Sequence, residues 1–63
     1  KMQSSIRYFF YNYAKKKPNS PGYMDLGRIE GILSGMKVEL AIFCQLLYKE
    51  GKVMEAKGIY DRN

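Results

Sequence analysis

The hydrophobic positions near the N-terminus recur with the period of a helix. Apolar and aromatic side chains fall at i, i+3, i+4, i+7 and i+8, namely Ile6, Phe9, Phe10, Tyr13 and Ala14. This spacing places them on one helical face. Aromatic residues also favour strands, but Phe9 and Phe10 are adjacent, which breaks the alternation that a strand needs. Pro18 pushes the residue before it out of the α region, so the pattern predicts a helix over about residues 4–16.

A loop separates this helix from a second periodic segment. Residues 17–22 contain two prolines and a glycine, which is typical of a turn. Apolar residues then alternate in steps of three and four positions, at Leu26, Ile29, Leu33, Met36, Leu40, Phe43 and Leu47. This seam predicts either one helix over about residues 23–50 or two helices that share a phase across a break near Gly35.

Three glycines lie on the side of this segment that faces away from the seam. Gly27, Gly31 and Gly35 are spaced four residues apart, and each costs a helix interior about 1 kcal/mol relative to alanine. Two explanations follow from this cost. Either another backbone packs closely against the glycines, or the helix breaks at Gly35.

The pattern after Gly51 predicts a short closing helix over about residues 52–60, with Val53, Ala56 and Tyr60 on one stripe. Gly51 suits the position just after a helix, and the short connection predicts an αα-hairpin. The fold class is therefore all-α. We expect a small helical bundle of three to four short helices with a C-terminal αα-hairpin, in which residues 1–63 form a single helical domain.

Residues 38–48 are apolar nearly all round the predicted helix, which indicates burial on more than one side. A chain of 63 residues has few helices to cover such a segment, so we expect a homo-oligomer. Glu39 and Gln45 interrupt the apolar run, and a charge there is expensive unless it is paired. We expect them to fix the register or the partner. The predicted oligomer or partner interface is Val38, Glu39, Ile42, Gln45 and Leu46.

The residue counts exclude the disulfides and zinc sites that usually stabilise a small protein. Cys44 is the one cysteine and there is no histidine, so no internal disulfide forms and no zinc set of the usual kind is present. We expect no metal and no cofactor. A free cysteine favours a reducing, cytoplasmic location. The longest nearly apolar run is too short to span a bilayer.

The spacing of the C-terminal hairpin resembles one tetratricopeptide-type repeat. Leu40-x2-Phe43-Cys44-x2-Leu47 on the first helix is followed by Gly51, Ala56 and Tyr60, which match the large, small and aromatic positions of that pattern. Leu40 stands where the usual residue is tryptophan, and a second repeat is missing. The resemblance implies a tightly packed hairpin and a role in protein–protein contact.

The sequence contains few residues that could carry out catalysis. No histidine is present for acid–base work near neutral pH, and Cys44 lies in an apolar stretch where thiols usually serve packing. The carboxylates mostly have a base at helical distance. The glycines lack the Lys-Ser/Thr pair and the preceding strand of a phosphate loop. We therefore expect a protein that is not an enzyme.

The charge is concentrated at the N-terminus, because residues 1–22 carry five basic and no acidic residues, whereas residues 23–63 carry six of each. On a helix, basic and aromatic side chains would share a face opposite Phe9, Phe10 and Tyr13. This candidate surface for an anion or nucleic acid comprises Arg7, Tyr8, Tyr11, Asn12, Lys15, Lys16 and Lys17. The structural alternative is that the tyrosines complete a core or an oligomer contact. A membrane surface is disfavoured, because any core needs the apolar stripe beside these residues.

These observations lead to two functional hypotheses. The first is a non-catalytic protein-interaction module, an adaptor, inhibitor or assembly protein that self-associates through apolar helices and binds a protein partner. A chain this short without a disulfide or metal site is also typical of small regulatory proteins of phages. The second is a nucleic-acid-binding or nucleotide-binding regulator that uses the basic and aromatic N-terminal helix. The two differ in salt dependence, because only phosphate binding weakens steeply as salt rises.

Overall fold

The part of the chain that the structure describes contains four α-helices. The structure is a computed structural model that describes residues 3–62, so Lys1, which contributes to the N-terminal charge, lies outside it. The helices are α1 (Ser4–Lys16), α2 (Leu26–Gly35), α3 (Val38–Lys49) and α4 (Val53–Tyr60), and these residues contain no strand. This confirms the all-α bundle predicted from the sequence.

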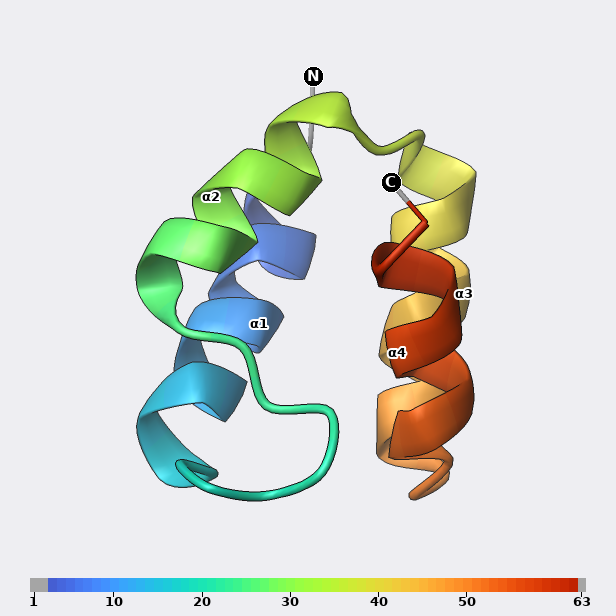
Figure 1. Ribbon diagram of the computed structural model, residues 1–63. Coiled ribbons are helices and arrows are strands. Elements are labelled where there is room, and N and C mark those ends of the chain that lie inside the picture. Colours follow the sequence, from blue (N-terminus) through green and yellow to red (C-terminus); the bar gives the residue numbers. More distant parts are fainter. Residues whose placement is uncertain (1–2, 63) are drawn as a thin grey trace.

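The helices pack as two pairs, with α1 against α2 and α3 against α4 (Figure 1). Contacts between α1 and α3 join the pairs, so α3 lies between α1 and α4. Side chains from all four helices fill the core between the pairs, with Phe10, Ile29 and Cys44 the largest that are fully buried. None of the helices in the described region is long and apolar enough to cross a membrane.

Helix α1 spans the range that its periodicity predicts. Its fully buried side chains are Ile6, Phe10 and Ala14, which are four residues apart. Phe9 and Tyr13 lie half-buried beside this stripe and pack against the core. The helix ends at Lys16, because Pro18 does not allow a helical conformation at the residue before it.

The second periodic segment breaks into two helices. Met36 and Lys37 have extended backbones, with ψ angles of 143° and 145°, so α2 ends at Gly35 and α3 begins at Val38. Of the two explanations for the glycines, the helix break is therefore correct within this chain. A Cβ atom at Gly31 or Gly35 would meet no atom within 4 Å, so no other part of the described chain packs closely there.

Helix α2 begins three residues later than the sequence pattern predicts. Asp25 is its N-cap, and the Oδ1 atom of Asp25 accepts a hydrogen bond of 2.8 Å from the backbone N–H of Arg28. Tyr23 and Met24 belong to the preceding loop, where the side chain of Met24 is buried in the core. The cap satisfies an N–H group that would otherwise lack a partner, and it fixes the start of the helix.

The predicted seam does not continue unchanged into α3. That helix buries Leu47 of the seam together with Ala41, Cys44 and Tyr48, and Leu40 packs against the core. Leu26 and Phe43, two of the seven seam residues, are 48% and 51% exposed. The seven positions therefore do not form one continuous buried face.

The α3–α4 pair is the predicted αα-hairpin. Gly51 has a φ of +79°, and its N–H donates to the Tyr48 carbonyl while the Lys52 N–H donates to the Leu47 carbonyl. This is the Schellman arrangement that closes a helix C-terminus. In the hairpin contact, the Cys44 sulfur lies 4.0 Å from the Ala56 carbonyl oxygen, and both residues are fully buried.

A single backbone carbonyl joins the loop to the C-terminal pair. The Gly22 carbonyl accepts hydrogen bonds from the hydroxyls of Tyr48 on α3, at 2.5 Å, and Tyr60 on α4, at 2.6 Å. Gly22 has a φ of +80°, and a Cβ atom there would lie 2.9 Å from the Cβ of Val53. Only glycine allows this backbone to approach α4 so closely in that conformation.

Candidate functional site

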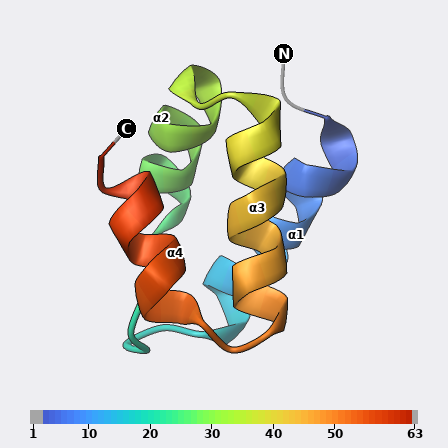
Figure 2. The same cartoon turned by 90° about the vertical axis from the view of Figure 1, so that its right-hand side faces the viewer.

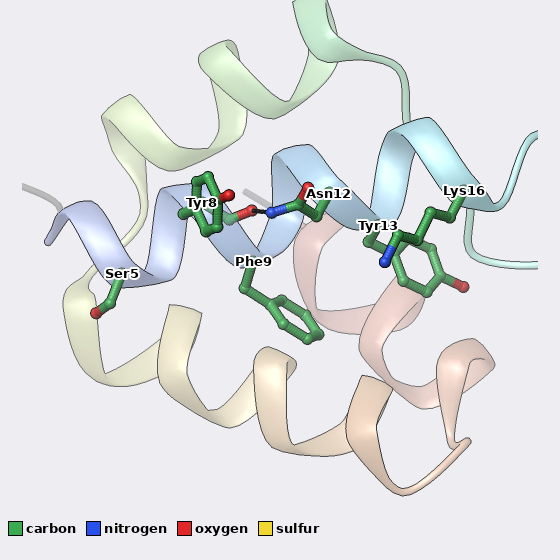
Figure 3. A pocket seen from close by; sticks show the side chains of 6 residues that line it. All are labelled: Ser5, Tyr8, Phe9, Asn12, Tyr13 and Lys16. Carbon is green, nitrogen blue, oxygen red and sulfur yellow. Dashed lines mark hydrogen bonds between the residues drawn. The ribbon is translucent and has the colours of Figure 1, made fainter.

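The outer side of α1 carries an open hollow of about 550 Å³, which we call the α1 hollow. Its lining residues come from one stripe of the helix: Ser5, Tyr8, Phe9, Asn12, Tyr13 and Lys16. Figure 3 shows Ser5 at one end of the hollow, with Tyr13 and Lys16 at the other. The Asn12 side-chain amide donates a hydrogen bond of 3.0 Å to the Tyr8 carbonyl (Figure 3), which holds Asn12 against the helix.

One wall of the α1 hollow is fixed by an aromatic cluster. The ring of Tyr48 on α3 lies with its centroid 4.4 Å from that of Tyr13 and 6.4 Å from that of Phe9. The Lys49 ammonium lies 5.7 Å from the centroid of the Phe9 ring, within cation–π range. The other wall is Tyr8, whose side chain is 71% exposed. The hollow thus combines a rigid aromatic wall, a free tyrosine and the amine of Lys16.

The seven residues predicted to bind an anion are divided among different surfaces. Tyr8, Asn12 and Lys16 line the α1 hollow, whereas Lys15 and Lys17 are exposed outside it. The remaining two, Arg7 and Tyr11, lie toward α2. The Arg7 guanidinium forms an ion pair of 3.3 Å with Glu30 and donates a hydrogen bond of 3.5 Å to the Tyr11 hydroxyl.

Sequence reasoning missed three residues of the α1 hollow, Ser5, Phe9 and Tyr13. Phe9 and Tyr13 were expected on the face opposite Tyr8 and Asn12, yet all four line the same hollow. The buried stripe of α1 is centred on Phe10, so Phe9 and Tyr13 flank it on the side of α3 and reach the surface there. Knowledge that α3 packs on this side was needed, and no pattern within residues 4–16 provides it.

The outer face of α3 is a second candidate surface. Ile42, Phe43 and Leu46 are 38%, 51% and 49% exposed, and Glu39 and Lys49 are exposed at its two ends. We call these five residues the outer face of α3. Figure 2 shows α3 at the front of the molecule, with α4 on one side and α1 on the other.

The predicted interface residues mostly fall on or beside the outer face of α3. Glu39, Ile42 and Leu46 belong to it. Val38 and Gln45 are half-buried, and Val38 packs against the core. Phe43 was assigned to the buried seam and was therefore absent from the predicted interface, although it is the most exposed apolar side chain of α3.

The buried titratable groups Cys44 and Tyr48 are part of the packed core. Burial raises the pKa of the Cys44 thiol, which disfavours the reactive thiolate. Burial also raises the pKa of Tyr48, and the neighbouring Tyr60 hydroxyl adds to the rise. Within residues 3–62, no cluster of three or more His, Cys, Asp or Glu side chains is arranged to hold a metal ion.

Comparisons with protein-family models, with curated proteins and with solved structures found no match for this chain. The tetratricopeptide-like spacing of residues 40–60 is therefore a local resemblance that describes the hairpin alone. The chain has two candidate functional surfaces, the α1 hollow and the outer face of α3.

Proposed function

We propose that this protein is a non-catalytic interaction module that self-associates through the outer face of α3. The observation that carries the proposal is the exposure of Ile42, Phe43 and Leu46 side by side on one helix. Contiguous apolar groups of this kind mark association surfaces more often than scattered single ones do. In an adaptor, inhibitor or assembly protein, such a face leaves the other surfaces open for a protein partner.

The position of α3 supports this proposal. The helix already packs against α1 on one side and α4 on the other, so no further helix of residues 3–62 is left to cover its third side. Each Å² of apolar surface removed from water contributes roughly 25 cal/mol. A second copy of the chain would supply the missing cover, and the association would persist in salt because it is not mainly electrostatic.

The direct test is the solution mass over a range of protein concentrations, at low and at high salt, by light scattering coupled to size exclusion. We expect a salt-tolerant increase of mass with concentration for the wild type and a monomer for Leu46→Glu. Met54→Glu is the matched control, because Met54 is an exposed apolar residue on α4, away from this face. A wild type that stays monomeric throughout would refute self-association.

The α1 hollow favours a second candidate function, the binding of a single-stranded nucleic acid. Tyr8 offers an exposed ring on which a base can stack. Lys15, Lys16 and Lys17 are exposed and take part in none of the ion pairs formed among residues 3–62, so their charges are available for phosphates. This arrangement combines a ring for stacking with positive charge at the C-terminal end of α1.

Fluorescence anisotropy with a labelled single-stranded oligonucleotide tests this second function. For each phosphate contacted, the logarithm of the binding constant should fall with the logarithm of salt with a slope of about −0.7. Replacing Lys15, Lys16 and Lys17 together by alanine should remove binding, and Tyr8→Ala should weaken it by about 1–3 kcal/mol. Lys37→Ala, an exposed lysine between α2 and α3, is the control. Affinity that does not respond to salt would refute this function.

A further inference from the structure

The outer face of α3 carries a stripe whose two ends have opposite charges. Glu39, Ile42, Leu46 and Lys49 are spaced by three, four and three residues, which places them in line along one side of a helix. Glu39 lies in the first turn of α3 and Lys49 in the last. The stripe is therefore acidic at one end, apolar in the middle and basic at the other end.

The two end charges form no ion pair with other residues in the described range 3–62. Four ion pairs form among residues 3–62: Arg7–Glu30, Arg28–Asp61, Lys52–Glu50 and Lys57–Asp61. Glu39 and Lys49 belong to none of them. Lys49 instead extends over the face of the Phe9 ring, which leaves its positive charge without a carboxylate. Both end charges are exposed and available to a second molecule.

We propose that a second copy of the chain docks on this stripe in the antiparallel direction, centred at residue 44. This inference rests on the proposed self-association and specifies its geometry. Residues 39 and 49 each lie five positions from residue 44, and residues 42 and 46 each lie two positions from it. Around a two-fold axis at that point, Glu39 faces Lys49 of the second copy and Ile42 faces Leu46 of the second copy.

The charges select this direction over a parallel one. A parallel pair in register would place Glu39 against Glu39 and Lys49 against Lys49, so both ends of the interface would repel. In the antiparallel pair, Glu39 and Lys49 attract each other at both ends. Specificity of this kind comes from destabilising the alternative arrangement as well as stabilising the chosen one. The pairing is self-complementary, as the interface of a symmetric dimer must be.

Phe43 has a defined place in this arrangement. It lies one residue from the centre of the stripe, on the side of α4, so the two phenylalanine rings of the dimer come together near the two-fold axis. Phe43 is 51% exposed in the single chain, and aromatic rings contribute much of the contact area of an interface. The antiparallel dimer thus covers the largest apolar side chain of the outer face.

The interface is small, because α3 has only 12 residues. Stable protein interfaces bury about 1,200–2,000 Å², and a stripe of this length lies at or below the lower limit. We therefore expect a dimer whose population depends strongly on concentration. The apolar contact supplies most of the affinity of such a dimer, and the two exposed Glu39–Lys49 pairs add a smaller contribution. Reversing one charge creates repulsion at both ends of the interface, which has a measurable effect on a weak dimer at low salt.

The decisive experiment is a charge exchange, measured by sedimentation at several concentrations and low salt. E39K and K49E should each weaken dimerisation about tenfold or more, because each turns both attractive pairs of the dimer into repulsions. The double variant E39K/K49E should recover the wild-type dissociation constant to within about threefold. An equimolar mixture of the two single variants should form heterodimers, in which both pairs are again attractive.

Matched controls separate this pairing from general effects of charge. Glu55 lies in the first turn of α4 and Lys15 in the last turn of α1, so E55K and K15E make the same changes of net charge and disturb a helix dipole equally. Neither lies on the outer face of α3. Both controls should dimerise as the wild type does, and circular dichroism should show the same helix content in all variants.

A cross-linking measurement gives the direction independently of charge. A mixture of Ile42→Cys and Leu46→Cys chains should form disulfide-linked dimers faster than either variant alone, because these positions face each other only in the antiparallel pair. Faster cross-linking of each variant with itself would indicate a parallel pair and overturn the inference. This experiment remains decisive if E39K does not fold.

The outcomes distinguish this inference from the proposed function. If the wild type associates and Leu46→Glu prevents it, but the double charge variant does not recover dimerisation, the antiparallel register is wrong and self-association stands. If E55K weakens the dimer as much as E39K does, the specific pairing is also wrong. If the wild type stays monomeric at every concentration, both proposals fail together.

Discussion

The outer sides of α1 and α3 occupy similar places in the fold but carry different chemistry. Each helix has a neighbour on both flanks, α2 and α3 for the first and α1 and α4 for the second, and each leaves one side free. On α1 that side holds the polar and aromatic residues of the hollow. On α3 it holds Ile42, Phe43 and Leu46, with one charge at each end. The same architecture therefore presents one mixed polar and aromatic surface and one mainly apolar surface.

The two sides also differ in what they gain from being covered. The α1 side keeps its polar atoms hydrated, and covering it requires a partner that replaces those hydrogen bonds. The α3 side exposes apolar groups that gain free energy when any complementary apolar surface covers them. Association through α3 should therefore tolerate salt, whereas binding through α1 should weaken as salt rises. Substitutions that affect one side more than the other, or both sides together, show how independent the two sides are.

Gly22→Ala should have the largest effect on stability. It disturbs the contact that joins the loop between α1 and α2 to the α3–α4 pair, and both surfaces depend on this contact. An alanine at a φ of +80° is strained, and its Cβ would lie 2.9 Å from the Cβ of Val53. Strain and overpacking together should cost about 2–4 kcal/mol of the free energy of unfolding. Urea titration followed by circular dichroism measures the loss. Association and oligonucleotide binding should decrease together, because neither surface survives unfolding.

The control for this variant is Gly51→Ala. Gly51 has nearly the same φ, +79°, but a Cβ atom there would meet nothing within 4 Å, so only the conformational cost of about 1–2 kcal/mol applies. The difference between the two variants isolates the contact of the Gly22 backbone with Val53. Equal losses at the two positions would show that this close approach contributes nothing to stability.

The sequence predicted the parts of the fold that local chemistry determines. The stop of α1 before Pro18 and the turn at Gly51 both depend on residues within a few positions. The start of α2 after its N-cap Asp25 also has a local signal, the capping carboxylate, but the apolar spacing placed the start about three residues earlier. Local signals thus locate helices well where only one interpretation fits.

The sequence could not predict which side of α3 is buried. The seam predicted Leu40, Phe43 and Leu47 on one face, but Phe43 is 51% exposed, and α3 also buries Ala41, Cys44 and Tyr48. Spacing alone does not distinguish a face made of large residues from one whose small residues let helices approach closely. The same limit concealed the α1 hollow, because the position of Phe9 at the surface depends on Tyr48, 39 positions later in the chain.

Tyr48→Phe should have an intermediate effect on stability that depends on pH. Burial and the nearby Tyr60 hydroxyl raise the pKa of Tyr48 above its ordinary value of 10.0, and burial raises that of Cys44 above 9.0. In the unfolded chain both groups lose protons at lower pH than in the folded protein. Their contribution to stability is therefore complete below about pH 9 and is lost progressively as pH rises beyond it.

Thermal unfolding between neutral and alkaline pH checks this expectation. At neutral pH, Tyr48→Phe should cost about 1 kcal/mol through the lost hydrogen bond to the Gly22 carbonyl. Its melting temperature should then fall less steeply than that of the wild type above pH 9. Tyr8→Phe, an exposed tyrosine on the outer side of α1, should follow the wild-type curve. Parallel curves for Tyr48→Phe and the wild type would contradict the role assigned to the buried hydroxyl.

Gly31→Ala should have the smallest effect, and it tests whether α2 presents a third association surface. Because a Cβ atom at Gly31 meets no atom within 4 Å, alanine should stabilise the helix by about 0.5–1 kcal/mol. The dissociation constant of the dimer should stay unchanged if α3 alone makes the contact. A variant that folds more stably but associates more weakly would show that a second copy packs closely over the exposed glycines. Association would then involve α2, and the contrast between α1 and α3 would no longer account for it.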